Sequence, residues 1–180
     1  MKRHFRFLFW LAVCGMPLQG ATLERLSMAD MIARSTAIVR GKVTGSTAAF
    51  SGPVIYTHYT VQVTEALKGT ASGTVDVVLP GGVAQNLRQS FAGTPTLDTG
   101  AEYVLFLYTG KSGLTTIVGL TQGLFTLNSA AAGDPTATRT ATRELMLDRA
   151  TGRPVKDDTL VMKMSSLRAQ IAAALQGAAK

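Results

Sequence analysis

Few side chains in this sequence offer the chemistry that catalysis requires. Beyond residue 20 there is one histidine, His58, no cysteine, and only scattered carboxylates. A serine or threonine nucleophile needs a base beside it. His58 lies close in sequence to Thr57 and Thr60, and Lys68 is a second candidate base. Because His58 falls on the polar face of a predicted strand, a solvated residue is the simpler interpretation, and we predict a non-enzymatic protein with no catalytic residue.

Metal and cofactor chemistry is not indicated either. One histidine and no cysteine do not form the ligand sets that transition metals prefer. Asp157 and Asp158 are the only adjacent acidic pair, but Ca²⁺ would need several more oxygen ligands, so we interpret the pair as a solvated turn. The stretch 110–113 lacks the upstream glycine and the strand-to-helix context of a phosphate-binding loop. We expect no metal and no cofactor.

The most promising binding surface lies in the long segment 80–100, which is rich in Gly, Thr and Pro. Connections of this length without structure of their own are uncommon and often functional, although some are plain surface crossovers. Within the segment we select Gly81, Gly82 and Arg88. His58 and Gln62, on the polar face of the preceding long strand, are the residues that we expect near them.

These residues need a scaffold, and residues 102–127 are its predicted centre. The run 103–108 is entirely apolar or aromatic, so both of its faces should be covered. Glycine-containing turns separate it from two further short apolar runs, 114–120 and 124–127. This pattern is typical of consecutive antiparallel strands in a β-barrel or sandwich.

The other predicted elements surround that centre. In residues 54–64, Tyr59, Val61 and Val63 alternate with polar residues, which indicates a half-buried strand. The break in this alternation at 65–69 predicts a bulge or bend. Ser27 can cap a short helix. Further predicted strands cover 37–43 and 74–79, and predicted helices cover 26–34 and 165–176.

The N-terminal residues resemble a secretory signal peptide. A basic head is followed by a short apolar core and a small-residue exit. The apolar core is shorter than the ~20 residues that a membrane span needs, so we do not expect it to remain as an anchor. We expect cleavage between Gly20 and Ala21, and no membrane-spanning segment in the protein after cleavage. Cys14 stands in a sequence loosely similar to a bacterial lipobox, so a lipid anchor at Cys14 is the alternative.

Charge and aromatic residues argue against nucleic-acid binding. Loss of Lys2, Arg3 and Arg6 with the leader would lower the formal charge from +7 to +4, and the remaining basic residues form no run of four. Tyr59 and Tyr103, which could stack on bases, fall on predicted core faces. We expect no nucleic-acid partner.

The order of four segments resembles that of the netrin-like module, the OB-type barrel of tissue inhibitors of metalloproteinases. The segments are 37–43, 59–69, 74–79 and 100–107. A set of uncharacterised bacterial secreted proteins has the same layout. In the inhibitors an N-terminal cysteine binds the protease zinc, whereas this chain would begin at Ala21 and lacks the cysteine framework. The resemblance therefore implies a fold and a protein-binding role, but no zinc-directed residue.

Together these observations predict a mainly β protein, an OB-like antiparallel barrel of five to six strands with a short N-terminal and a C-terminal helix. The expected organisation is a signal peptide (1–20), the barrel domain (21–128) and a C-terminal extension ending in a helix (129–180). The predicted function is an exported, periplasmic or secreted, binding module whose partner is an envelope or secreted protein. A small envelope hydrolase and a lipid-anchored structural protein remain as alternatives, and the sequence leaves the oligomeric state open.

Overall fold

The computed structural model describes residues 21–128 and 133–178. The predicted leader, with Cys14 and Gly20, lies outside these residues, and Ala21 is the first residue described. The described chain is mainly β, as predicted, with two α-helices, α1 (Met28–Arg34) and α2 (Met164–Ala178), and one short 3₁₀ helix, η1 (Leu120–Gly123). The strands are β1 (Thr22–Glu24), β2 (Ala37–Ser51), β3 (Val54–Lys68), β4 (Thr74–Pro80), β5 (Gly82–Ala84), β6 (Leu87–Gln89), β7 (Glu102–Thr109), β8 (Thr115–Ile117), β9 (Leu124–Asn128), β10 (Thr136–Arg139), β11 (Leu145–Leu147), β12 (Pro154–Val155) and β13 (Leu160–Lys163).

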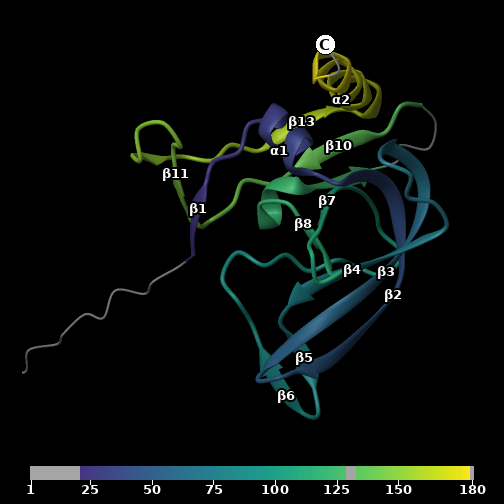
Figure 1. Cartoon of the computed structure of the whole chain (residues 1–180), viewed down its shortest axis with the longest axis vertical. Helices are drawn as coiled ribbons and strands as arrows, with labels where there is room; N and C mark the ends of the chain where they lie inside the picture. The colour runs from purple at the N-terminus through teal and green to yellow at the C-terminus, as the bar shows by residue number, and fades with distance from the viewer. Residues whose placement is uncertain (1–20, 129–132, 179–180) are drawn as a thin grey trace, which may run out of the picture.

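One large curved sheet forms the body of the molecule (Figure 1). Its order is β13-β10-β9-β7-β2-β3-β4, and β8 pairs with β7 beside this path. Two small sheets accompany it: β1-β11-β12, in which β1 and β11 are parallel, and the hairpin β5-β6.

The predicted small barrel of five to six strands is wrong in its closure and in its strand number. Among the described residues, β4 lies beside β8, yet no ladder joins them. β8 is short because the chain turns into η1 soon after it, through Gly119 and Leu120 at φ values of 63° and 58°. On the other side, β10 and β13 extend the sheet beyond β9, so the C-terminal part shares one sheet with the strands before Asn128.

The long β2–β3 hairpin gives the sheet its curvature. The two strands pair from Ile38 to Ser51, with register shifts that include one between Val43 and Gly45 and one between Ile38 and Val39, opposite Lys68 and Ala66. Such bulges bend a strand and increase its twist, which agrees with the predicted irregularity near 65–69. The strands run further than predicted because the small and polar residues after Val43 also pair, up to a turn at Gly52.

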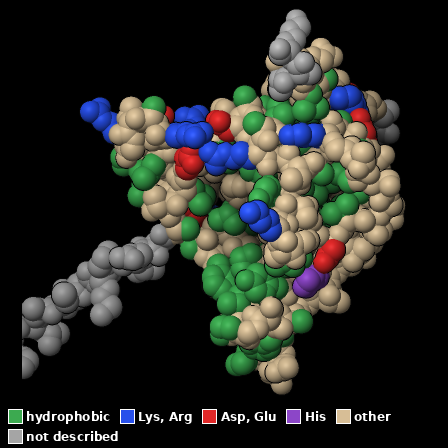
Figure 2. All heavy atoms as spheres, viewed as in Figure 1, with side chains coloured by type: hydrophobic (Ala, Val, Ile, Leu, Met, Phe, Trp, Pro, Cys, Tyr) green, Lys and Arg blue, Asp and Glu red, His purple; other side chains and the backbone are tan. Residues whose placement is uncertain are grey.

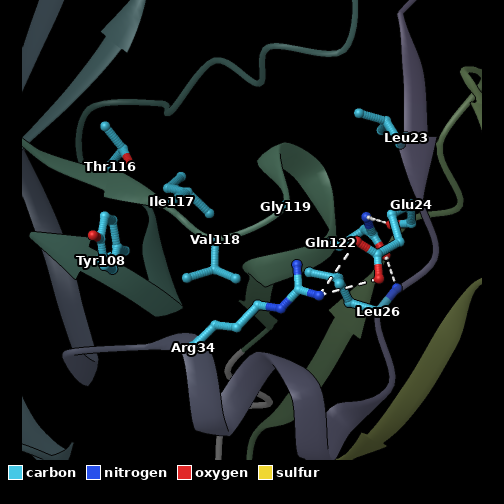
Figure 3. A pocket seen from close by; sticks show the side chains of 10 residues that line it. All are labelled: Leu23, Glu24, Leu26, Arg34, Tyr108, Thr116, Ile117, Val118, Gly119 and Gln122. Atoms are coloured by element: carbon cyan, nitrogen blue, oxygen red, sulfur yellow. Dashed lines mark hydrogen bonds and ion pairs between the residues drawn. The ribbon is translucent and has the colours of Figure 1, made fainter. Parts of the chain in front are cut away.

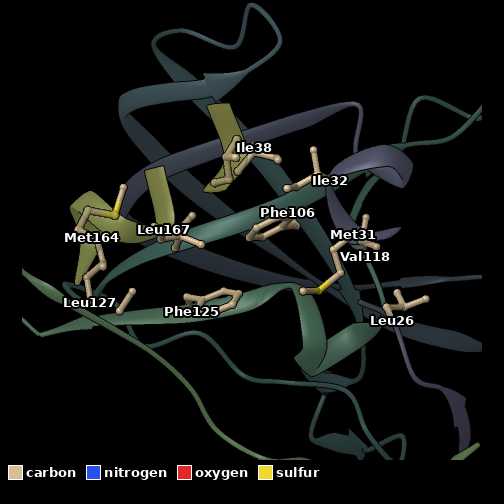
Figure 4. Close-up of a cluster of buried hydrophobic side chains, with 13 residues drawn as sticks. Leu26, Met31, Ile32, Ile38, Phe106, Val118, Phe125, Leu127, Met164 and Leu167 are labelled. Carbon is tan, nitrogen blue, oxygen red and sulfur yellow. The ribbon is translucent and has the colours of Figure 1, made fainter. Parts of the chain in front are cut away.

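Strand β7 is buried on both faces, as its sequence predicted. Val104 and Phe106 face one hydrophobic cluster, which also contains residues of α1, α2 and β9 (Figure 4). Tyr103, Leu105 and Leu107 face a second cluster, which β2, β3 and β4 complete.

The two helices cover the first cluster. Helix α1 begins with the predicted cap: the Asp30 amide donates to Ser27 Oγ, and the Ser27 amide donates to the Asp30 carboxylate. Helix α2 buries Leu167 and Ile171 in the same cluster. Its Arg168 donates two hydrogen bonds, of 2.7 and 2.9 Å, to the Glu65 carboxylate on β3.

The predicted solvated turn at Asp157 and Asp158 is wrong for Asp157. Asp157 is buried, accepts a hydrogen bond from Arg139 Nη2, and accepts another from the Thr142 amide at 2.8 Å. Arg139 Nη2 also donates to the Asp158 carbonyl at 2.8 Å. Because burying a charge is costly unless it is paired, the carboxylate and the guanidinium depend on each other.

Replacing Phe106 by Ala should lower the free energy of unfolding by about 3–5 kcal/mol, because it leaves a cavity among buried side chains. Phe106 is completely buried, and the centre of its ring lies 5.7 Å from the centre of the Phe125 ring. Urea unfolding measures the loss. Tyr108→Ala is the control, since Tyr108 lies on the same strand but is 48% exposed; equal losses in both variants would contradict the assigned core.

The Glu65–Arg168 pair should make stability depend on pH. The Arg168 guanidinium lowers the pKa of the Glu65 carboxyl below its usual value of 4.5. The folded-state pKa is therefore below the unfolded one, so the pair stabilises the protein fully above the unfolded pKa, and this contribution is lost as pH falls through the folded pKa. The stability difference between wild type and Glu65→Gln, measured by urea unfolding, should shrink as pH falls below about 4.5. Arg168→Gln should remove the same contribution, and an unchanged pH dependence in both variants would refute this account.

Candidate functional site

The segment between β4 and β7 contains a hairpin that the sequence did not reveal. β5 and β6 pair through Gly82 with Gln89 and Ala84 with Leu87. Gln85 and Asn86 connect them with φ values of 50° and 64°. Two successive positive φ angles are typical of a type I′ turn, which usually has a glycine; without the glycine, the pattern gave no hairpin prediction.

The hairpin is fixed to the β2–β3 turn by side chains. Gln89 Oε1 accepts a hydrogen bond of 2.7 Å from the Ile55 amide, and its Nε2 donates one of 2.9 Å to the Pro53 carbonyl. Thr57 Oγ1 donates to the Gly81 carbonyl at 2.7 Å, and the Gly81 amide donates to the Ile55 carbonyl at the same distance. The hairpin therefore keeps a defined position relative to the large sheet.

Gly81 and Gly82 make this position possible. Their φ values of 104° and 133° lie in the region that favours glycine. A Cβ on Gly82 would overlap Thr57 Oγ1 and approach the Ala48 Cβ to 3.1 Å. The two glycines let the backbone approach β2 and β3 closely.

A cavity of about 380 Å³ lies between this hairpin and β3. Tyr59, Leu79 and Pro80 contribute apolar lining, and residues 88–91 form another part of its wall. Three large apolar side chains in this region remain exposed, Val83 (53%), Leu87 (59%) and Phe91 (42%). We call Val83, Leu87, Arg88 and Phe91 the hairpin surface. Figure 2 shows hydrophobic side chains gathered at the end of the molecule where β5 and β6 lie.

The structure separates the five predicted site residues into two groups. Gly81, Gly82 and Arg88 line the cavity together, whereas His58 and Gln62 are not among its lining residues. His58 Nδ1 lies 2.7 Å from Asp76 Oδ2, and Gln62 Nε2 donates to the Gly73 carbonyl at 2.9 Å. Both side chains therefore interact with the β4 side of β3.

The candidate bases of a hydrolase are not assembled into a catalytic site within the described residues. Lys68 Nζ donates to the Ile32 carbonyl at 2.6 Å, at the end of α1. His58 has Asp76 as its partner, and no hydrogen bond joins either base to a hydroxyl group there. The described residues also contain no cluster of three or more His, Cys, Asp or Glu that could hold a metal ion.

Sequence reasoning missed Val83, Leu87, Gln89 and Phe91. Each is a single residue in a segment of mixed composition, so periodicity gave no indication of its role. The hairpin pairing decides which of them are exposed and which anchor the hairpin. No helix in the described ranges 21–128 and 133–178 has the length and apolar character needed to span a membrane. No family model, curated protein or solved structure matches the chain.

Gly82→Ala should lower the free energy of unfolding by at least about 2 kcal/mol, because the new Cβ meets Thr57 and the backbone is held at positive φ. Gly45→Ala is the matched control, since a Cβ there meets nothing within 4 Å. Urea unfolding and the amide NMR shifts of residues 82–91 measure both effects. Equal behaviour of the two variants would contradict the assigned role of Gly82.

Proposed function

We propose that this chain is an exported protein-binding module that contacts its partner through the hairpin surface. The observation that carries the proposal is the exposure of Val83, Leu87 and Phe91 on a hairpin beside a cavity. Exposed apolar side chains that gather in one region of a surface are typical of interaction sites, and their burial in a complex would favour association.

The composition and anchoring of the hairpin support this function. Residues 80–97 contain a single charged side chain, Arg88, so a partner would meet mainly neutral surface with one cation. The Gln89 and Thr57 hydrogen bonds hold the hairpin before binding. A surface that is already ordered loses less conformational entropy on association.

The resemblance to the netrin-like module contributes to this proposal through the order of the strands. The ladder order β7-β2-β3-β4, with β8 paired to β7 and lying beside β4, supports an open OB-type core within the larger sheet. Export is inferred from the signal-like residues before Ala21. The hydrolase alternative has less support, because His58 and Lys68 contact a carboxylate and a carbonyl rather than a hydroxyl.

Leu87→Ser and Phe91→Ser should each weaken partner binding about tenfold or more, as expected for apolar anchors at the centre of an interface. The partner is first identified by pull-down of the tagged, processed protein from the envelope and secreted fractions of the producing cells. Its dissociation constant is then measured for each variant.

Val161→Ser is the matched control, since Val161 on β13 is 63% exposed but lies outside the hairpin surface. It should leave binding unchanged. Recovery of a partner whose affinity is the same for wild type, Leu87→Ser and Phe91→Ser would refute the proposal, as would recovery of no protein partner.

A further inference from the structure

A second cavity, of about 520 Å³, lies between the N-terminal strand and the end of β8. It shares no lining residue with the cavity beside the hairpin surface. Its volume falls within the range of about 300–1,000 Å³ that is typical of small-molecule sites. Figure 3 shows side chains from β1, α1, β7 and the β8–η1 segment arranged around it.

The lining is mainly apolar. Ile117 and Val118 are buried, and together with Leu23 and Leu26 they supply aliphatic surface. Tyr108 borders the same space and is the exposed end of the otherwise buried β7. An apolar body of several carbons could therefore lose its contact with water here.

The wall of this cavity is fixed by a buried glutamine. Gln122 Oε1 accepts a hydrogen bond of 2.8 Å from the Leu26 amide, and Nε2 donates one of 2.9 Å to the Glu24 carbonyl. Gly119 allows the sharp turn at φ 63°, and a Cβ there would come within 2.8 Å of Leu26 Cδ1. The cavity is thus preformed, not dependent on a ligand for its shape.

The polar group that distinguishes this cavity is the Arg34 guanidinium. Its Nη2 lies 3.1 and 3.3 Å from the two Glu24 carboxylate oxygens. Nε and Nη1 make no hydrogen bond within the described residues. Glu24 Oε1 also lies 3.2 Å from Arg149 Nε, so one carboxylate is shared by two guanidinium groups. In Figure 3 the Arg34 side chain extends from α1 towards Glu24 and passes below Val118.

We propose that this cavity binds a small organic carboxylate with an apolar body, such as a medium-chain fatty acid or an arylalkanoic acid. The apolar part packs on Leu23, Ile117 and Val118, and the carboxylate accepts hydrogen bonds from Arg34 Nε and Nη1. A charge-assisted pair of this kind is stronger than a neutral one. The ligand class follows from the combination of an apolar wall with the free donors of one cation.

The test uses the processed protein with octanoate and 3-phenylpropionate, and with octanamide and 3-phenylpropanamide as neutral counterparts. Amide NMR shifts locate the site, and titration calorimetry gives the dissociation constants. Each acid should shift the amides of residues 116–119 and bind at least about fivefold more tightly than its amide. Shifts confined to other residues, no shifts, or equal affinities for acid and amide would each overturn the proposal.

Arg34→Gln should abolish the preference for acid over amide while leaving amide binding within about twofold of wild type.

Glu24→Gln should have the opposite effect and tighten acid binding, roughly threefold, because it frees Arg34 Nη2 and removes a nearby negative charge. Lys42→Gln is the matched control, since Lys42 is a cation on β2 that lies opposite Glu102, at the other end of β7, and does not line the cavity; it should leave both affinities unchanged. A purely structural role of Arg34 would change acid and amide affinities together, which would also overturn the assignment. The melting temperature of each variant shows that it is folded.

Discussion

The burial of β7 on both faces is the constraint on which the rest of the structure depends. A strand with five consecutive buried side chains needs a hydrophobic layer on each side. One layer comes from α1, α2 and the β9–β10 region, and the other from the curved β2–β3–β4 part of the sheet. The bulges of the long hairpin matter for the same reason, because a flat sheet could not bend over the second face of β7.

Local patterns of the sequence predicted the elements whose structure depends on near neighbours. The capping residues Ser27 and Asp30 lie three positions apart, and the alternation of Tyr59, Val61 and Val63 distinguishes the buried face of β3. The sequence predicted a barrel, whereas the sheet is open between β4 and β8, and the hairpin β5-β6 was not predicted. Closure depends on which distant strand edges meet, and the hairpin turn uses Gln85 and Asn86 at positive φ instead of the usual glycine.

The candidate site was also predictable only where it depends on local sequence. Gly81 and Gly82 could be identified from sequence because adjacent glycines indicate unusual backbone angles. His58 and Gln62 were placed on the correct face of β3, but that face carries them to Asp76 and Gly73. Both cavities arise from tertiary packing of distant segments, and no local pattern contains that information.

Gln122 also has a consequence for the order in which the chain folds. Its side chain accepts a hydrogen bond from the amide of Leu26, which lies 96 positions earlier in the chain. Strand β1 pairs with β11, which lies further along the chain than Gln122. Contacts between such distant segments form slowly, because the loss of loop entropy precedes any gain from the contact. The first strand of the described residues is therefore among the last to dock, and until then Leu26 remains in water. During this interval the unfinished end of the molecule is the part most exposed to proteases and to aggregation.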